Sequence, residues 1–245
     1  MFIKKILSVL HKALYIFVIF CIVITVLFYV YSWITGFELD DKKFNNLLKE
    51  NNIEHIYDGV DGFLDFNFRL GTGYGEIKYH GMDMLCKLLV DKNIDIRETV
   101  FIDCGSGIGK ALVMAILLGY KRAVGVEIVK SRHKMALTVY DRLPSNIRSL
   151  ISIYNEDILT FSLEGLLAEN KDKPIVVFIS NLLWPIDITR HLYSKFLKVL
   201  PSNSLIVSSI YRVNPDDEIY ISSVEDYEVE MSWNRNNKCK VTVVK

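Results

Sequence analysis

The chain has 245 residues, and its 29 basic side chains (Lys and Arg) balance its 29 acidic ones, so the formal net charge at pH 7 is zero. This balance excludes the bulk electrostatic attraction for nucleic acid that a basic domain has, although a local basic patch remains open. The four cysteines are scattered without the spacing of a zinc site or a disulfide scaffold, and the length suits one sizeable domain plus an appendage.

The first feature along the chain is an uncharged apolar segment at residues 13–37. A helix needs about 20 apolar residues to cross a bilayer core, so this segment is long enough. A cleaved signal peptide has a shorter apolar region, and a buried core helix is the alternative. Tyr29, Tyr31 and Trp33 suit the aromatic belt at a membrane interface. We therefore predict a short N-terminal tail at 1–12, one transmembrane helix and a single-pass membrane localisation.

The segment after the predicted span carries lysines, as does the segment before it, so the positive-inside rule gives no orientation. No Asn-x-Ser/Thr acceptor follows the span, which disfavours exposure to a glycosylating lumen.

Residues 38–60 are polar with helical stretches, which predicts a linker or capping helix. The main domain is then expected to span 61–245. Its first part is rich in glycine up to Gly75, which predicts a loop.

A glycine-rich turn at the centre of the chain reads VFIDCGSGIGK over residues 100–110. An apolar run ends at Asp103, and an apolar helical pattern follows over 111–118. Between them lie Gly105, Ser106, Gly107 and Gly109. Glycine accepts positive φ and allows a ligand to approach the backbone closely. A buried strand, a tight turn and a helix N-terminus together predict a nucleotide-like ligand site in an open α/β sheet.

Two nucleotide fingerprints fail at this turn. The dinucleotide pattern requires a third glycine at the position of Lys110, and the phosphate-binding P-loop requires GK[ST] after the glycines. What remains is D-x-G-x-G-x-G followed by an acid, Glu127, at the end of the next predicted strand, 123–127. An ordinary strand-turn-helix without a ligand is the alternative.

Strands and helices alternate through the rest of the domain and then give way to strands alone. We predict helices over 82–90, 110–120, 131–142 and 187–199, strands over 150–154, 175–180, 204–211, 217–222 and 227–233, and a last β segment over 238–245. This order predicts an α/β fold with a seven-stranded Rossmann-like sheet, helices on both faces and an antiparallel end hairpin.

The glycine motif and its acid resemble motif I of class I S-adenosylmethionine methyltransferases. Further motifs occur in an order that resembles the catalytic domain of the non-SET histone lysine methyltransferases, the disruptor-of-telomeric-silencing family. They are YGE before motif I, DCGSGIGK, VGVE, NED, SNLLWP and MSWNRNNKCKVTVV. The resemblance covers roughly the whole domain from residue 61 to the end. It implies a methyltransferase sheet and S-adenosyl-L-methionine as the cofactor.

The resemblance also implies cofactor contacts. The glycine turn would lie against the methionine part of the cofactor, and Glu127 would take both ribose hydroxyls through charge-assisted hydrogen bonds. Asp157 would accept from the adenine amine, unless it is only a helix N-terminal acid. The expected cofactor-binding residues are Tyr74, Glu76, Asp103, Gly105, Ser106, Gly107, Gly109, Glu127, Asp157 and Ile158.

The substrate is expected at the carboxyl end of the fourth predicted strand. Asn181 would accept a hydrogen bond from an amine, Trp184 would wall the channel, and an Asx turn with a packed tryptophan is the alternative. The resemblance implies that Asn181 and Trp184 line the lysine channel and that Trp233 falls in the segment that closes it; Leu182 is also expected in the substrate channel. The expected catalytic residues are Asn181, Trp184 and Tyr74, and the sequence indicates no metal site.

This chain departs from the family pattern at several positions. Ile77 stands where threonine usually follows YGE, Ser180 replaces the first of two asparagines, and Leu182 replaces an aromatic residue. The basic nucleosome-binding extension is also missing. These departures disfavour a histone within a nucleosome as the substrate.

We therefore predict a membrane-anchored protein lysine N-methyltransferase. Its partners would be a protein with a target lysine and the bilayer, through 13–37, with the domain on the cytosolic side where the cofactor is made. Strong nucleic-acid binding is not indicated. The alternatives are a small-molecule or lipid methyltransferase, or a non-catalytic membrane-tethered module with a cofactor fold.

Overall fold

The computed structural model describes residues 14–15, 17–20, 23, 41–60, 75–170 and 173–245. The chain divides into two units, Met1–Asp41 and Lys42–Lys245. The described residues before Asp41 are helical, and their apolar side chains are exposed. Across all described parts of the chain, no helix is long and apolar enough to cross a membrane. This finding overturns the predicted transmembrane helix and membrane localisation; most of 13–37 lies outside the described residues.

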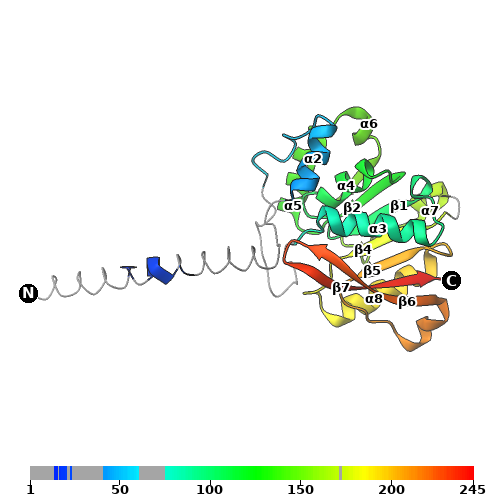
Figure 1. Ribbon diagram of the computed structural model, residues 1–245. Helices are drawn as coiled ribbons and strands as arrows, with labels where there is room; N and C mark the ends of the chain where they lie inside the picture. The colour runs from blue at the N-terminus through cyan, green and yellow to red at the C-terminus, as the bar shows by residue number, and fades with distance from the viewer. Residues whose placement is uncertain (1–13, 16, 21–22, 24–40, 61–74, 171–172) are drawn as a thin grey trace, which may run out of the picture. The chain divides into compact units, whose positions relative to one another are not determined.

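The second unit is built on a seven-stranded sheet with the order β3-β2-β1-β4-β5-β7-β6 (Figure 1). Its strands are β1 (Val100–Cys104), β2 (Arg122–Val126), β3 (Ile151–Tyr154), β4 (Ile175–Ile179), β5 (Leu205–Ser208), β6 (Ile221–Met231) and β7 (Asn234–Val244). The first five strands run parallel, whereas β7 pairs antiparallel with β5 and with β6. The predicted α/β sheet with an antiparallel end pair is therefore confirmed.

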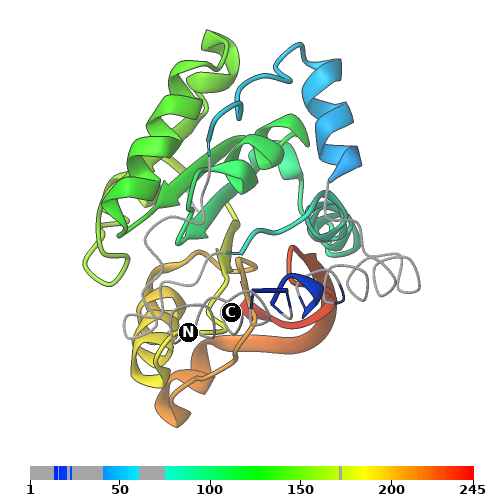
Figure 2. The same ribbon diagram turned by 90° about the vertical axis from the view of Figure 1, so that its left-hand side faces the viewer.

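Helices cover both faces of this sheet. They are α2 (Lys42–Glu50), α3 (Tyr79–Asp91), α4 (Lys110–Leu117), α5 (Lys130–Asp141), α6 (Ser145–Arg148), α7 (Glu164–Asn170) and α8 (Ile186–Val199), with 3-10 turns η2 (Ile96–Glu98) and η3 (Pro215–Tyr220). Successive strand side chains point to opposite faces, so Phe101 joins the core under α3 and α4 while Ile102 joins the core under α8. Figure 2 shows α5 in green and α8 in yellow on opposite sides of the sheet.

The central strand β1 is buried along its whole length, as its apolar sequence predicts. Because β1 lies between β2 and β4, the loops that follow these strands meet at one edge of the sheet. This edge is the topological switch point of the fold, where α/β sheets bind ligands.

The late strands differ from the prediction. The predicted strand over 217–222 is instead the turn η3, with Pro215 at its start and three acidic residues in its first turn. Proline at the first helical position and acids near the N-terminus both stabilise a helical turn. Strand β6 begins only at Ile221, and the predicted strand over 204–211 ends at Ser208.

Residues 42–60 belong to the second unit rather than to the N-terminal one. Phe44 and Leu48 of α2, together with Ile53 and Ile56 of the following turns, are buried in the core that contains α3 and α4. The predicted capping helix therefore packs on the domain. The start of the domain at residue 61 stays a prediction.

Candidate active site

The glycine turn after β1 is held against the end of β2. The backbone N–H groups of Gly105 and Ser106 both donate to the carbonyl oxygen of Val126, at 2.8 and 3.2 Å. Gly105, Gly107 and Gly109 have φ values of 86°, 55° and 82°, a region that disfavours side chains. The alternating glycines are thus required by the backbone itself, and α4 begins directly after the third.

Glu127 ties the glycine turn to the loop after β2. Its carboxylate is buried and accepts a hydrogen bond from Gly107 N–H at 2.8 Å and another from Val129 N–H at 2.7 Å. Asn155, which the sequence analysis did not single out, donates from its side chain to the Glu127 carbonyl oxygen at 2.8 Å. The three loops after β1, β2 and β3 are therefore joined around one buried acid.

Gly125 is a second residue that the sequence analysis missed. A Cβ atom there would lie 2.5 Å from Leu112 Cδ1 and 2.6 Å from Ser106 Oγ, distances that are too short for any side chain. Glycine inside an otherwise branched strand usually marks a close approach of another segment, and this signal was visible in the sequence AVGVE. The close approach here is that of the glycine turn and α4.

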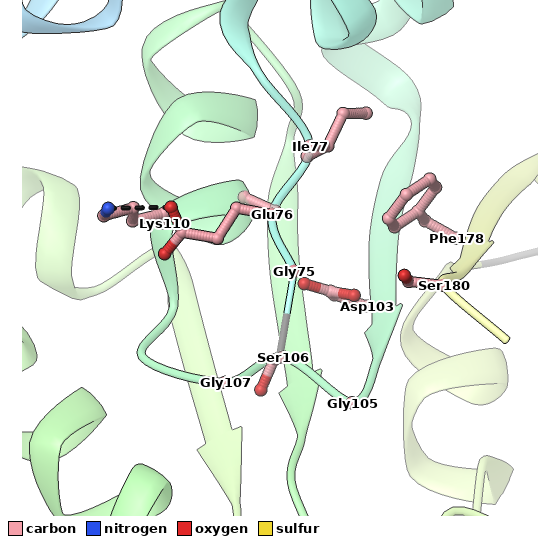
Figure 3. A pocket seen from close by; sticks show the side chains of 11 residues that line it. Gly75, Glu76, Ile77, Asp103, Gly105, Ser106, Gly107, Lys110, Phe178 and Ser180 are labelled. Carbon is pink, nitrogen blue, oxygen red and sulfur yellow. Dashed lines mark hydrogen bonds and ion pairs between the residues drawn. The ribbon is translucent and has the colours of Figure 1, made fainter. Parts of the chain in front are cut away.

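A hollow opens above the glycine turn, with an empty volume of about 350 Å³ that includes its open mouth. It is lined by Gly75, Glu76, Ile77, Asp103, Gly105, Ser106, Gly107, Lys110, Ala111, Phe178 and Ser180 (Figure 3). Six residues of this lining were not predicted as site residues: Gly75, Ile77, Lys110, Ala111, Phe178 and Ser180. The structure brings the YGE segment, the glycine motif and the end of β4 to one place.

Asp103 is a buried carboxyl group in this lining. Burial, and secondly the charge of Glu127, raise the pKa of Asp103 to about 7. A carboxyl group with this pKa changes its charge near neutral pH, and a cation bound beside it would favour the ionised form.

Opposite charges lie together at one end of the hollow. Lys110 Nζ forms an ion pair with Glu76 Oε2 at 2.8 Å, and the side chains are 32% and 21% exposed. Lys110 Nζ also lies 5.7 Å from the centre of the Tyr57 ring, within range of a cation–π contact. A ligand that carries both an ammonium and a carboxylate group could exchange partners with this pair.

Residues 75–77 form one wall of the hollow, and the segment 75–78 is held in place by hydrogen bonds to residues 230–233. Ser232 N–H donates to the Glu76 carbonyl at 2.7 Å, Glu76 N–H donates to Ser232 Oγ at 3.0 Å, and Lys78 N–H donates to the Glu230 carbonyl at 3.0 Å. The Trp233 ring covers Gly75 so closely that a Cβ atom there would lie 1.9 Å from the ring. The structure therefore explains the glycine of YGE. Tyr74 lies outside the described residues.

Asn181 and Ser180 face different surroundings at the end of β4. The Asn181 side chain is fully buried; it accepts from Ile210 N–H at 2.9 Å and donates to the Ile210 carbonyl at 2.8 Å. These bonds fix the loop after β5, whereas Ser180 lines the hollow. Trp184 is half-buried, and its ring lies 3.4 Å from where a Gly105 Cβ would be. Leu182 is exposed.

The loop after β3 holds the last two predicted cofactor residues. Asp157 is half-buried, and its carboxylate accepts from Leu159 N–H at 2.9 Å, while Ile158 is buried. Lys195 of α8, another residue that the sequence analysis missed, donates to three carbonyl oxygens of this loop.

Within the part of the chain that the structure describes, no group of three or more His, Cys, Asp and Glu side chains is placed to hold a metal.

The residues of the hollow fit the predicted cofactor. S-adenosylmethionine carries an ammonium, a carboxylate, a sulfonium and two ribose hydroxyls. The lining of the hollow contains a cation, Lys110, and two carboxyl groups, Glu76 and Asp103. At the glycine turn it exposes backbone that carries no side chains. Beside it lies Glu127, whose two oxygens each have a second lone pair.

Several solved structures are similar to this chain, and the one with a TM-score above 0.5 shows the fold. The chain is similar to a putative RNA methyltransferase from Pyrococcus horikoshii at 13% identity, with a TM-score of 0.51 and coverage of 82% of this chain and 95% of that one. It is also similar to an RNA methyltransferase from Salinibacter ruber in complex with S-adenosyl-L-homocysteine, at 15% identity, a TM-score of 0.42 and coverage of 66% and 92%. The glycopeptide N-methyltransferase MtfA complexed with (S)-adenosyl-L-methionine matches at 11% identity, a TM-score of 0.46 and coverage of 67% and 93%.

A protein-family model shows the family to which this chain belongs. No curated protein matches the chain. The model of the histone methylation protein DOT1 family matches residues 66–243, which is more than half of the sequence and includes the whole hollow. The chain therefore belongs to the family of the histone methylation protein DOT1, and it is an S-adenosylmethionine-dependent methyltransferase.

Proposed function

We propose that this methyltransferase transfers the methyl group to the ε-amino group of a lysine in a protein. The observation that carries the proposal is the pairing of residues 75–78 with 230–233, because both segments resemble motifs of lysine methyltransferases and residues 75–77, which line the hollow, are held by this pairing. The match to the DOT1 family over 66–243 supports the same substrate class.

The cofactor supplies an electrophilic methyl group on a sulfonium centre. For this cofactor, Glu127 would hold the ribose, Asp103 and Glu76 the ammonium, Lys110 the carboxylate, and the loop at Asp157 the adenine. The glycine turn, Gly105 to Gly109, would let the cofactor lie directly on the backbone. Buried, preorganised acceptors of this kind lose little energy to reorganisation on binding.

The substrate amine must be neutral, since a lysine with its ordinary pKa near 10.4 is protonated at pH 7. Its lone pair forms the new bond to the methyl carbon while the bond to sulfur breaks, and the amine proton leaves to water. Ser180 and Trp184 would border the amine, whereas Asn181 would act by fixing the loop that contains Ile210. Alignment and exclusion of water would supply most of the acceleration.

A two-step experiment on the full chain tests this proposal. Calorimetry should first detect S-adenosylhomocysteine binding to the parent but not to Glu127→Ala. Methyl transfer from isotope-labelled cofactor to free histones and to a soluble protein extract should then give methylated lysine by mass spectrometry of the digested products. A folded parent that binds no cofactor product, or labelled methyl groups found only outside lysine, would contradict the proposal.

A second candidate is a small-molecule acceptor with an apolar part. Leu182, Leu183 and Ile186 follow the hollow residue Ser180, and 47%, 51% and 52% of these side chains are exposed. Exposed apolar side chains that cluster beside a site often mark a binding surface. Labelled methyl groups recovered in a solvent-extractable small-molecule fraction, with none in protein, would favour this candidate.

A further inference from the structure

Lys195 lies in the middle of α8 and reaches the loop that follows β3. Its Nζ donates to the carbonyl oxygens of Ile158 at 2.7 Å, Leu159 at 3.1 Å and Phe161 at 2.6 Å. An ammonium group has three N–H donors, and the three carbonyl oxygens of this loop accept one hydrogen bond from each. The side chain is half-buried, which makes the pairing of its charge more important for stability.

The loop itself is a compact turn that depends on Asp157. The Asp157 carbonyl accepts from the N–H groups of Thr160 and Phe161, and its carboxylate accepts from Leu159 N–H at 2.9 Å. The turn therefore points three carbonyl oxygens toward one place, and their partial negative charges would repel one another without a cation there. Lys195 supplies that cation from another element of the fold.

The same helix follows the expected substrate segment in the chain. Helix α8 begins at Ile186, directly after the segment that follows β4 and contains Ser180 and Trp184. Lys195 is therefore a direct polar link between the helix that starts at the substrate side and the turn that carries Asp157 and Ile158.

We infer that Lys195 is a positioning residue for the adenine end of the site. By binding the carbonyl groups of Ile158, Leu159 and Phe161, it holds the turn in the shape in which the Asp157 carboxylate and the Ile158 side chain can receive the purine ring. The inference rests on the proposed cofactor placement, and it assigns to α8 a role in discriminating adenine from other bases.

The test compares two ligands that differ only in the purine. S-adenosylhomocysteine has an exocyclic amine that can donate to Asp157, whereas its inosine counterpart has a carbonyl oxygen at that position. The full-length parent should bind the adenosine form about tenfold or more tightly, which is typical of a hydrogen bond to a charged group. In Lys195→Met this ratio of dissociation constants should fall toward one. In Lys195→Arg, which keeps the charge and several donors, part of the ratio should return.

A matched control lies on the same helix. Lys198 is one turn from Lys195, and its Nζ bonds to Ser194 Oγ and Asp217 Oδ1 instead of the adenine turn. Lys198→Met should leave the ratio at the parental value. Thermal unfolding of each variant separates a loss of overall stability from a loss of purine discrimination, because only the latter changes the ratio.

The outcomes separate this inference from the proposed function. A folded parent that binds neither ligand overturns both. A parent that discriminates, together with a Lys195→Met variant that keeps the full ratio, overturns the role of Lys195 and leaves the proposed function intact. If Lys195→Met does not fold, Lys195→Gln replaces it; glutamine is shorter and uncharged, so it does not supply a cation to the three carbonyl oxygens, and an unchanged ratio in that variant overturns the inference equally.

Discussion

Two walls of the hollow are built in different ways. The glycine turn and Glu127 meet across 20 residues of sequence, through a hydrogen bond between consecutive β–α units. The long-range pair of 75–78 and 230–233 joins segments 156 residues apart. The first wall follows from a short motif, whereas the second exists only because the antiparallel strand β6 ends beside the YGE segment. Cofactor binding should therefore depend most on the first wall and be adjusted by the second.

The largest effect is expected from Glu127→Ala. The change removes the expected ribose acceptor and leaves the N–H groups of Gly107 and Val129 without their partner. A hydrogen bond to a charged group is worth about 1.5–3 kcal/mol, so the loss of both expected ribose bonds should lower cofactor affinity at least about a hundredfold. Calorimetry with S-adenosylhomocysteine measures this. The exposed Glu156 is the matched control, since Glu156→Ala should change affinity little; near-parental binding by Glu127→Ala would contradict the site.

The second wall is tested by Gly75→Ala. The new methyl group would lie 1.9 Å from the Trp233 ring, so the ring must move. We expect about tenfold weaker cofactor binding, on the scale of an overpacking strain of roughly 1–3 kcal/mol. Gly165→Ala is the control, because that position faces open space. The double variant Gly75→Ala/Trp233→Ala should recover part of the loss if the clash is its cause; no recovery would locate the defect elsewhere.

The titration of Asp103 predicts that the stability of the folded protein depends on pH. Its pKa is raised from 3.8 to about 7 in the folded protein, so the folded state binds this proton more tightly than the unfolded state. Its contribution to stability is therefore present at acid pH and is lost as pH rises toward 7. Chemical denaturation in steps of about half a pH unit, from roughly pH 4.5 to 8, should show this slope in the parent and not in Asp103→Asn.

Cofactor affinity should change with pH in the opposite direction to stability. The cationic cofactor favours the ionised Asp103 carboxylate, so affinity should rise with pH by up to about tenfold per unit below pH ~7 and level off above it. Calorimetry across this range measures the effect. The prediction would be contradicted by a cofactor affinity that does not change with pH in the parent. It would also be contradicted if the affinity of Asp103→Asn changed with pH as much as that of the parent.

The smallest effect is expected from the partly exposed ion pair of Lys110 with Glu76. Exposed ion pairs stabilise proteins by roughly 0–1 kcal/mol, so Lys110→Met should change the free energy of unfolding by less than about 1 kcal/mol. Its cofactor affinity should fall more clearly than its stability if the lysine takes the cofactor carboxylate. Lys121→Met, at a surface position before β2, serves as the comparison.

Much of the central sheet could be predicted from the sequence. Apolar runs such as 175–179 have no competing interpretation, and Asp103 followed by alternating glycines specifies a turn that only glycine adopts without strain. The late region was harder, because the predicted strand over 217–222 is apolar enough for β structure while Pro215 and its acids favour a helical turn.

Local patterns along the chain were enough to predict the fold class, the glycine turn and Glu127, because backbone conformation and strand burial there are local properties. The tertiary structure decided which residues share the hollow. It placed Ser180 rather than Asn181 in the lining, brought Trp233 onto Gly75, and directed Lys195 to the turn after β3. These contacts join elements far apart in the chain, and no local pattern encodes a hydrogen bond whose partner is chosen by the packing of the whole sheet.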